Sequence, residues 1–497
     1  MPGDYDTLIE LVRETQTLAS VQELLDWDQE TYMPPNGVTA RAEQLATLAK
    51  TTHDRQTDPR IGELLDKIDG TLNDPLQAAN LRETRRDYDR AVKIPSDLIA
   101  RIAKAGSHAQ KAWAKAREQS AFSKFEPHLV KLLDLKREVA ELIGYEGEPY
   151  DALLDEFEPG ERAETVAKVF AELRGPLSEF VRQIAEASTR PDESIVRREF
   201  PRPAQEAFAR KLAEAVGFDF ESGRIDVSTH PFCSGATPSD VRLTTRYNER
   251  HFSPAIFGVL HETGHGLYQQ GLDSAHMFTP MGSAVSLGIH ESQSRLWENM
   301  VGRSRAFWEH FYPDCRAAFP AALGDVSLDR FVGAINAVQP SLIRVEADEV
   351  TYNLHIILRF ELERAMVSGK LAVRDIPDAW NAKMQEVLGI TPANDADGCL
   401  QDIHWSFGAF GYFPTYALGN LYAAQFYAAA QRDLGDLTDQ IRRGNFKNLL
   451  DWLRVNIHRH GQRYRAAELV ERVTGKPLST GPFLSYLRDK FAPIYGL

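Results

Sequence analysis

The sequence contains few cysteines and no long apolar run, and each absence excludes a class of protein. Only Cys233, Cys315 and Cys399 occur in 497 residues, and their spacing matches no metal-binding motif. We therefore expect three core thiols in a reducing compartment. No stretch approaches the roughly 18 consecutive apolar residues of a membrane-spanning helix, and residues 1–6 lack the basic-then-apolar pattern of a signal peptide. These features predict a cytoplasmic protein with no membrane partner.

A cluster of basic residues is also missing. Lysine and arginine total 57 against 71 aspartates and glutamates, and the resulting net charge of −14 is spread along the chain. An acidic chain without a basic patch has little attraction for nucleic acid or for anionic membranes. We therefore expect neither as a partner. Hydrophobic residues make up 43% of the sequence, which is enough for a large globular core.

Most of the sequence has the 3.6-residue periodicity of helices. Residues 5–31 form an amphipathic pattern that stops abruptly at Met33-Pro34-Pro35-Asn36-Gly37. The same periodicity predicts helices over residues 41–52, 79–92, 96–119, 163–188 and 341–368 and along the C-terminal stretch. We therefore expect a mainly α fold, with residues 1–497 forming one domain. Its parts are an N-terminal helical region (1–200), a central core (201–430) and C-terminal helices (431–497).

One segment has the pattern of a β-strand. Residues 239–247 alternate between polar and apolar side chains and are rich in β-branched residues. We expect them to form an edge strand, which can hold an extended peptide by main-chain hydrogen bonds. The strand would lie beside the segment that carries the chemistry, because that segment follows it directly.

That segment is His261-Glu262-Thr263-Gly264-His265. Two histidines four residues apart lie on one face of a helix, at a spacing suited to a shared metal ion. Glu262 then points toward the open coordination position of the metal. There it can take a proton from a bound water and return it to a leaving amine. The motif predicts the zinc core of a metallopeptidase.

A third ligand is available 26 residues after His265, at Glu291. It lies in a segment, residues 285–298, whose apolar positions predict a second buried helix. Two histidines, a carboxylate and a water form the ligand set of a catalytic zinc site. His290 is an alternative ligand, but neighbouring helix residues cannot both face one ion. We expect one zinc ion per chain, which cobalt could replace.

These motifs belong to a larger ordered set. The set comprises His230-Pro231-Phe232, Asp240-x-Arg242-x-Thr244, His261-Glu262-x-x-His265, His290-Glu291-Ser292-Gln293, Ile343-Arg344-x-x-Ala347-Asp348 and Gly398-x-x-Gln401-Asp402-x-His404-Trp405. It resembles the signatures of the carboxypeptidase Taq family of zinc metallocarboxypeptidases, and the likeness runs nearly from end to end.

The resemblance implies a helical fold similar to neurolysin and angiotensin-converting enzyme. Such a fold would have a deep active-site groove and a small β-sheet near the zinc helix. It also implies a homodimer whose substrates are peptides and which releases single C-terminal residues with broad specificity. The alternative function is a helical oligopeptidase or dipeptidyl carboxypeptidase with the same zinc core.

Catalysis also needs a donor for the oxyanion that forms during peptide hydrolysis. Related helical peptidases use histidine and tyrosine in a segment comparable to residues 404–416. We therefore favour His404 as a catalytic residue, followed by Tyr412 and Tyr416, which the sequence does not rank.

A carboxypeptidase must recognise a free terminal carboxylate, for which a guanidinium is suited. Arg344 is the first candidate and Arg242 the second, although either could instead pair with a nearby aspartate. His230 is expected to bind substrate or to orient the ligands, as are Gln401 and Asp402.

Overall fold

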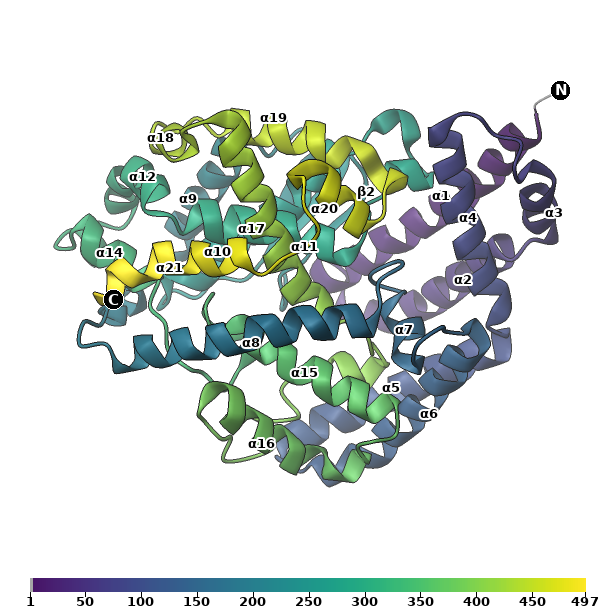
Figure 1. Ribbon diagram of the computed structural model, residues 1–497, viewed down its shortest axis with the longest axis horizontal. Helices are drawn as coiled ribbons and strands as arrows, with labels where there is room; N and C mark the ends of the chain where they lie inside the picture. The colour runs from purple at the N-terminus through teal and green to yellow at the C-terminus, as the bar shows by residue number, and fades with distance from the viewer. Residues whose placement is uncertain (1–2) are drawn as a thin grey trace.

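The computed structural model describes residues 3–497 and consists mainly of helices (Figure 1). The first nine helices are α1 (Asp4–Thr31), α2 (Val38–Gln56), α3 (Pro59–Ile68), α4 (Pro75–Lys93), α5 (Ser96–Glu118), α6 (Glu126–Ile143), α7 (Pro149–Leu154), α8 (Ala163–Glu186) and α9 (Arg202–Ala215). The others are α10 (Phe252–Gly271), α11 (Leu287–Arg295), α12 (Arg305–Ala318), α13 (Pro320–Leu323), α14 (Leu328–Ile335), α15 (Tyr352–Val367), α16 (Ile376–Leu388), α17 (Pro414–Leu434), α18 (Leu437–Arg442), α19 (Lys447–Asn456), α20 (Ala466–Thr474) and α21 (Gly481–Tyr495). No helix within residues 3–497 is both long and apolar enough to cross a bilayer.

The helices predicted in the N-terminal region are confirmed. Helix α1 ends at Thr31, just before the two prolines that cannot continue it. Helices α1, α3 and α4 share a small hydrophobic core, formed around Leu8, Leu65 and Leu81, at one end of the molecule (Figure 1). A much larger core extends from α5 to the C-terminal helix α21. The N-terminal helices therefore pack partly on one another.

The helix predicted over residues 341–368 is wrong in its first part. Residues 341–351 form a loop with one 3-10 turn (Arg344–Glu346), and α15 begins only at Tyr352. Asp348 stabilises the loop, because its carboxylate accepts hydrogen bonds from the backbone of Val350 and Thr351 and from the Thr351 hydroxyl. Side-chain acceptors thus satisfy backbone groups that a helix would have paired internally.

A three-stranded sheet lies beside α10. Its strands are β1 (Gly223–Val227), β2 (Cys233–Thr237) and β3 (Asp240–Thr245), in the order β1-β3-β2. The predicted strand is confirmed as β3, but its predicted edge position is wrong. β1 pairs with it in parallel and β2 antiparallel, so β3 is central and β2 forms the edge that contacts α1 and α10. The sequence gives little signal for β1 or β2, because each has five residues and neither is rich in large apolar side chains.

Two glycines bring three helices close together around α11. A Cβ on Gly264 of α10 would lie 2.6 Å from Cα of Ser294, and one on Gly419 of α17 would lie 2.6 Å from Cβ of Glu291. Contacts this short are accessible only to glycine. The backbones of α10 and α17 therefore approach α11 closely on two sides.

Candidate metal centre

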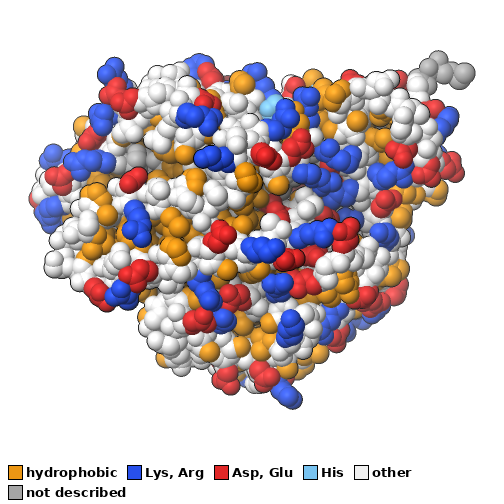
Figure 2. All heavy atoms as spheres, in the orientation of Figure 1, with side chains coloured by type: hydrophobic (Ala, Val, Ile, Leu, Met, Phe, Trp, Pro, Cys, Tyr) orange, Lys and Arg blue, Asp and Glu red, His pale blue; other side chains and the backbone are white. Residues whose placement is uncertain are grey.

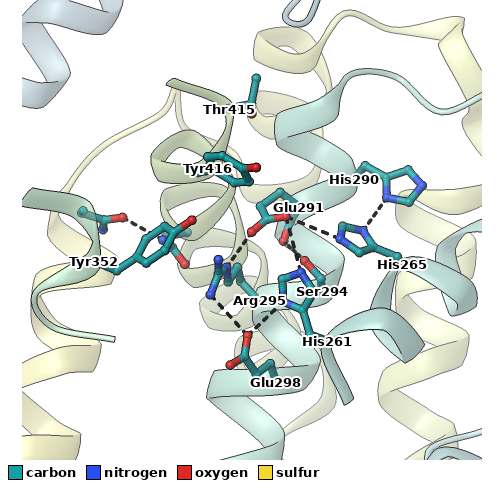
Figure 3. A network of polar contacts seen from close by, with 12 residues as sticks. His261, His265, His290, Glu291, Ser294, Arg295, Glu298, Tyr352, Thr415 and Tyr416 are labelled. Carbon is teal, nitrogen blue, oxygen red and sulfur yellow. Dashed lines mark hydrogen bonds and ion pairs between the residues drawn. The ribbon is translucent and has the colours of Figure 1, made fainter. Parts of the chain in front are cut away.

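The two motif histidines and Glu291 converge at one point. His261 and His265 extend from α10, and Glu291 extends toward them from α11 (Figure 3). Candidate ligand atoms of the three residues all lie within 4.8 Å of one another. Oε2 of Glu291 lies 3.5 Å from Nε2 of His265 and 3.8 Å from Nε2 of His261. Two imidazole nitrogens and a carboxylate oxygen match the donor set of a catalytic zinc site, so the residues fit the predicted ion.

Each histidine has a partner on the ring nitrogen that faces away from Glu291. Nδ1 of His261 lies 2.9 Å from Oε2 of Glu298, and Nδ1 of His265 lies 2.5 Å from Nδ1 of His290. Such partners fix the orientation and tautomer of a metal-binding imidazole. His290, the alternative ligand, thus lies behind His265 and outside the converging set.

Glu298 was not among the residues predicted for the site. It lies on a π-helical turn, Leu296–Gly302, that continues α11. Such turns occur often at functional sites. Arg295, also not predicted, connects the two carboxylates: its Nε lies 2.6 Å from Glu291 and its NH1 3.3 Å from Glu298. Arg295 and Glu298 follow Glu291 by four and seven residues, and this spacing places all three side chains on one helix face. The spacing is the signal by which the sequence could have identified them.

Both carboxylates remain charged although they are buried. Burial by itself raises the pKa of Glu291, but Arg295 and the two histidines hold it well below its usual range. Burial likewise opposes ionisation of Glu298, whereas the hydrogen bond to His261 and the charge of Arg295 keep its pKa at about 2. An anionic Glu291 is therefore available for a cation at neutral pH.

Glu262 is surrounded by protein but lies next to the donor set. Burial raises its pKa above the usual value, against the opposing effect of His261 and His265. A raised pKa brings a carboxylate closer to the range suited to a general base near neutral pH. Burial and the charge of Glu262 both raise the pKa of Cys233, which places edge strand β2 near this carboxylate.

The three candidate oxyanion donors form one aromatic cluster. Nε2 of His404 lies 3.2 Å from the hydroxyl of Tyr416, and the rings of His404 and Tyr412 are 5.2 Å apart. Burial and the charge of Arg344 lower the pKa of His404 to about 3, so its imidazole is neutral at pH 7. Burial raises the pKa of both tyrosines and Glu291 adds to the shift, which puts them near the metal ligands. Figure 3 shows Tyr416 beside Glu291.

Arg344 is buried in a network of polar groups. Its Nε and NH2 each lie 2.8 Å from Oδ1 of Asp402, and its NH1 donates to the hydroxyl of Tyr352. Arg359 donates to the other oxygen of Asp402 at 2.7 Å. The side chain of Gln401 accepts from the backbone N–H of Arg344. Gln401 and Asp402, expected to orient other groups, thus fix Arg344.

Arg242 and His230 lie farther from this network. Arg242 is paired with Asp240, and its guanidinium lies 4.2 Å from the centre of the Trp27 ring. The loop that carries His230 is attached to β3, where the hydroxyl of Thr244 accepts from the backbone N–H of Phe232. Among residues 3–497, the exposed imidazole of His230 forms no hydrogen bond. The structure thus joins the motif of residues 230–232 to the motif of residues 240–244, but it places His230 at the surface.

The close contact at Gly419 leads to a prediction. Gly419→Ala should destabilise the protein by about 1–3 kcal/mol, because the new methyl would overlap Cβ and Cγ of Glu291. It should also weaken metal binding by displacing that ligand. The measurements are thermal unfolding and metal titration. Gly175→Ala on α8 is the control, since a Cβ there would have no atom within 4 Å. Equal effects of the two substitutions would contradict the expectation.

A mostly helical chain in which two histidines of one helix and a glutamate of the next converge is a metallopeptidase of the helical class. The chain belongs to the M32 family: the family model described as carboxypeptidase Taq (M32) metallopeptidase matches residues 7–491. It is therefore a metallocarboxypeptidase, a peptide hydrolase, as the sequence motifs predicted.

Individual relatives agree over their whole length. The chain is 51% identical to thermostable carboxypeptidase 1 of Thermus thermophilus, over 99% of each chain. It is 39% identical to carboxypeptidase 1 of Bacillus subtilis, over 98% of this chain and 97% of the relative. Among solved structures, the M32 carboxypeptidase of Deinococcus radiodurans R1 is 42% identical and matches with a TM-score of 0.97, over 99% of this chain and 100% of that one. The predicted helical fold is thereby confirmed.

Proposed function

We propose that this metallocarboxypeptidase uses zinc to release single residues of many kinds from the C-termini of peptides. The observation that carries the proposal is the convergence of His261, His265 and Glu291 next to the buried carboxylate of Glu262. Zinc, when bound, acts as a Lewis acid and makes water acidic enough to react at neutral pH. Glu262 takes a proton from the attacking water and later gives it to the leaving amine.

Side chains from η9 (His404–Phe407), the loop that follows it and the start of α17 complete the reaction site. Neutral His404 donates a hydrogen bond to the oxygen on which negative charge develops, and Tyr412 or Tyr416 supplies a second donor. His404 and Tyr416 lie in hydrogen-bond contact, so the two side chains form one cluster. Fixed donors of this kind stabilise the transition state because they are oriented before the reaction begins.

Arg344 is proposed to bind the terminal carboxylate of the substrate. Asp402 and Tyr352 hold the guanidinium in one orientation, which favours a defined contact with a second anion. Its distance from Tyr416 supports the role, since the guanidinium carbon lies 5.0 Å from the centre of that ring. Arg242, paired with Asp240 in the sheet, remains the second candidate.

Substrate recognition by Arg344 can be tested with paired substrates. Arg344→Ala should lower kcat/KM for free-acid peptides by about 100-fold or more, because an ionic hydrogen bond pair is lost. Peptides with an amidated C-terminus, already poor substrates, should change far less. Arg344→Lys should recover part of the loss, and Arg242→Ala serves as the comparison. Equal losses of kcat/KM for acid and amide substrates would show that Arg344 stabilises the protein and does not bind the terminal carboxylate.

The mode of cleavage distinguishes the proposal from its alternative. A peptide ladder digested with and without chelator and analysed by mass spectrometry should lose successive single C-terminal residues, only when metal is present. Dipeptide products or internal cleavage would instead indicate a dipeptidyl carboxypeptidase or an oligopeptidase. Sedimentation of the same preparation tests the predicted homodimer.

A further inference from the structure

A large cavity lies outside the proposed reaction site. It has a volume of about 1170 Å³ and is bounded by α12, α14, α17, α18 and α21, together with the π-helical turn that carries Glu298. None of the residues assigned above to metal, catalysis or substrate lines it. Its size is comparable to that of pockets that hold small organic ligands, which measure roughly 300–1,000 Å³. Nothing in the proposed function uses this space.

Apolar side chains form most of the inner wall. Met300, Val332, Ala424 and Ile441 line the cavity and are buried in the protein. Helices α14, α18 and α21 surround the region at the left of Figure 1, and Figure 2 shows hydrophobic atoms mixed with lysine and arginine side chains on this face. The wall therefore suits the hydrocarbon part of a ligand.

One cation on the wall has unused hydrogen-bond donors. Arg303 donates to the carbonyl of Ile335 at 2.8 Å and to Glu298 at 3.3 Å, so two of the five N–H donors of its guanidinium have partners. It lines the cavity, and its side chain is 20% exposed. The guanidinium also packs on the ring of Phe257, because its central carbon lies 3.8 Å from the centre of that ring. Arg303 is thus fixed in place with donors free for an anion.

The other cations on the wall are either fully paired or exposed to solvent. Lys490 contacts Glu349 at 2.6 Å, the carbonyl of Asn299 at 3.0 Å and the Tyr486 hydroxyl at 3.0 Å, which uses all three ammonium donors. Three arginines on the wall are exposed: Arg305 pairs with Asp329, Arg330 pairs with Asp192, and Arg190 donates to the carbonyl of Ala185. Arg303 is the arginine of the wall that is mostly buried, so an anion held inside the cavity would contact it.

A hydroxyl group also lines the cavity. Tyr427 lines the cavity, and within residues 3–497 its hydroxyl forms no hydrogen bond. The hydroxyl oxygen is not fully enclosed by the protein. The cavity thus offers a hydroxyl as well as a guanidinium with unused donors.

We propose that this cavity is a second binding site, which takes a small amphipathic carboxylate. The carboxylate contacts Arg303, and the hydrocarbon body lies along Met300, Val332 and Ala424. An anion is favoured over a cation because the unused donors belong to a guanidinium. An apolar body is favoured because the buried side chains of Met300, Val332, Ala424 and Ile441 line the cavity.

The first test compares two ligands of equal chain length but opposite charge. Calorimetric titration of the metal-loaded enzyme should show that decanoate binds saturably, about 10-fold or more tightly than decyltrimethylammonium. Arg303→Gln should abolish this preference while the weaker, charge-independent binding remains. Equal affinities of the wild-type protein for the two ligands would overturn the assignment of Arg303.

The second test locates the ligand, because decanoate could also bind at the proposed reaction site. Ala428 is exposed and lines the cavity on α17, so Ala428→Phe should fill part of it and weaken decanoate binding by about 10-fold or more. Ala171→Phe, at an exposed position of α8 outside the cavity, should have no effect. Unchanged binding by Ala428→Phe would place decanoate elsewhere and overturn the proposal. A change of oligomeric state in that variant alone would also overturn it, since a second copy of the chain would then cover the cavity.

Discussion

Glu262→Gln is expected to lower kcat by about 10²- to 10⁴-fold while the protein still binds metal. The amide has nearly the shape of the carboxylate but cannot accept a proton from water. Because Glu262 lies beside the ligands and not among the converging three, its substitution should leave their geometry intact. Steady-state kinetics on a free-acid peptide and metal analysis of the purified variant provide the two measurements.

The pair of measurements separates two roles. Loss of both metal and activity would make Glu262 a ligand, and retention of both would remove it from the reaction. Glu298→Gln is a useful comparison, because Glu298 is also a buried carboxylate near the site but, among the three proposed ligands, contacts only His261, at its outer nitrogen. Its substitution should cost about 10- to 100-fold in metal affinity.

Glu291→Ala is expected to have the largest effect on metal binding, exceeding about 100-fold in affinity. The substitution removes one of three donors and leaves Arg295 without the carboxylate 2.6 Å from its Nε. A titration with a competing chelator gives the affinity, and added zinc should restore activity only at high concentration.

His290→Ala is the matched control for this experiment, since it removes the neighbouring side chain on the same helix. His290 contacts Nδ1 of His265, so its loss should cost about 10- to 100-fold in metal affinity or activity while the three donors persist. A larger loss of metal with His290→Ala than with Glu291→Ala would exchange the two assignments.

The parts of the site that sequence could predict are those in which local spacing decides the geometry. His261 and His265 share a helix face at any position in a fold, and the periodicity around Glu291 already required a buried helix. In contrast, the partner of Arg344 is Asp402, 58 residues away along the chain. The sequence suggested a nearby aspartate instead, because proximity in sequence was the only available information. Tertiary packing determines such pairs.

The same distinction explains the errors in the fold. The central position of β3 depends on two short strands with weak local patterns, so its partners could not be identified from alternation alone. The loop over residues 341–351 has helix-like periodicity, but the carboxylate of Asp348 and the side chain of Gln401 stabilise another backbone path. In both cases, contacts formed only in the folded chain outweigh local propensity.

The glycines that bring α10 and α17 against α11 also limit which ions the centre can accept. With backbone on both sides of α11, Glu291 cannot follow a larger or smaller ion by a shift of its helix. Only rotations of side chains remain to adjust the ligand distances. An ion whose preferred radius or coordination number does not match this arrangement of donors would therefore bind with longer or bent bonds rather than reshape the site. Selectivity among metals thus depends on the rigidity of helix packing as well as on the chemistry of the ligands.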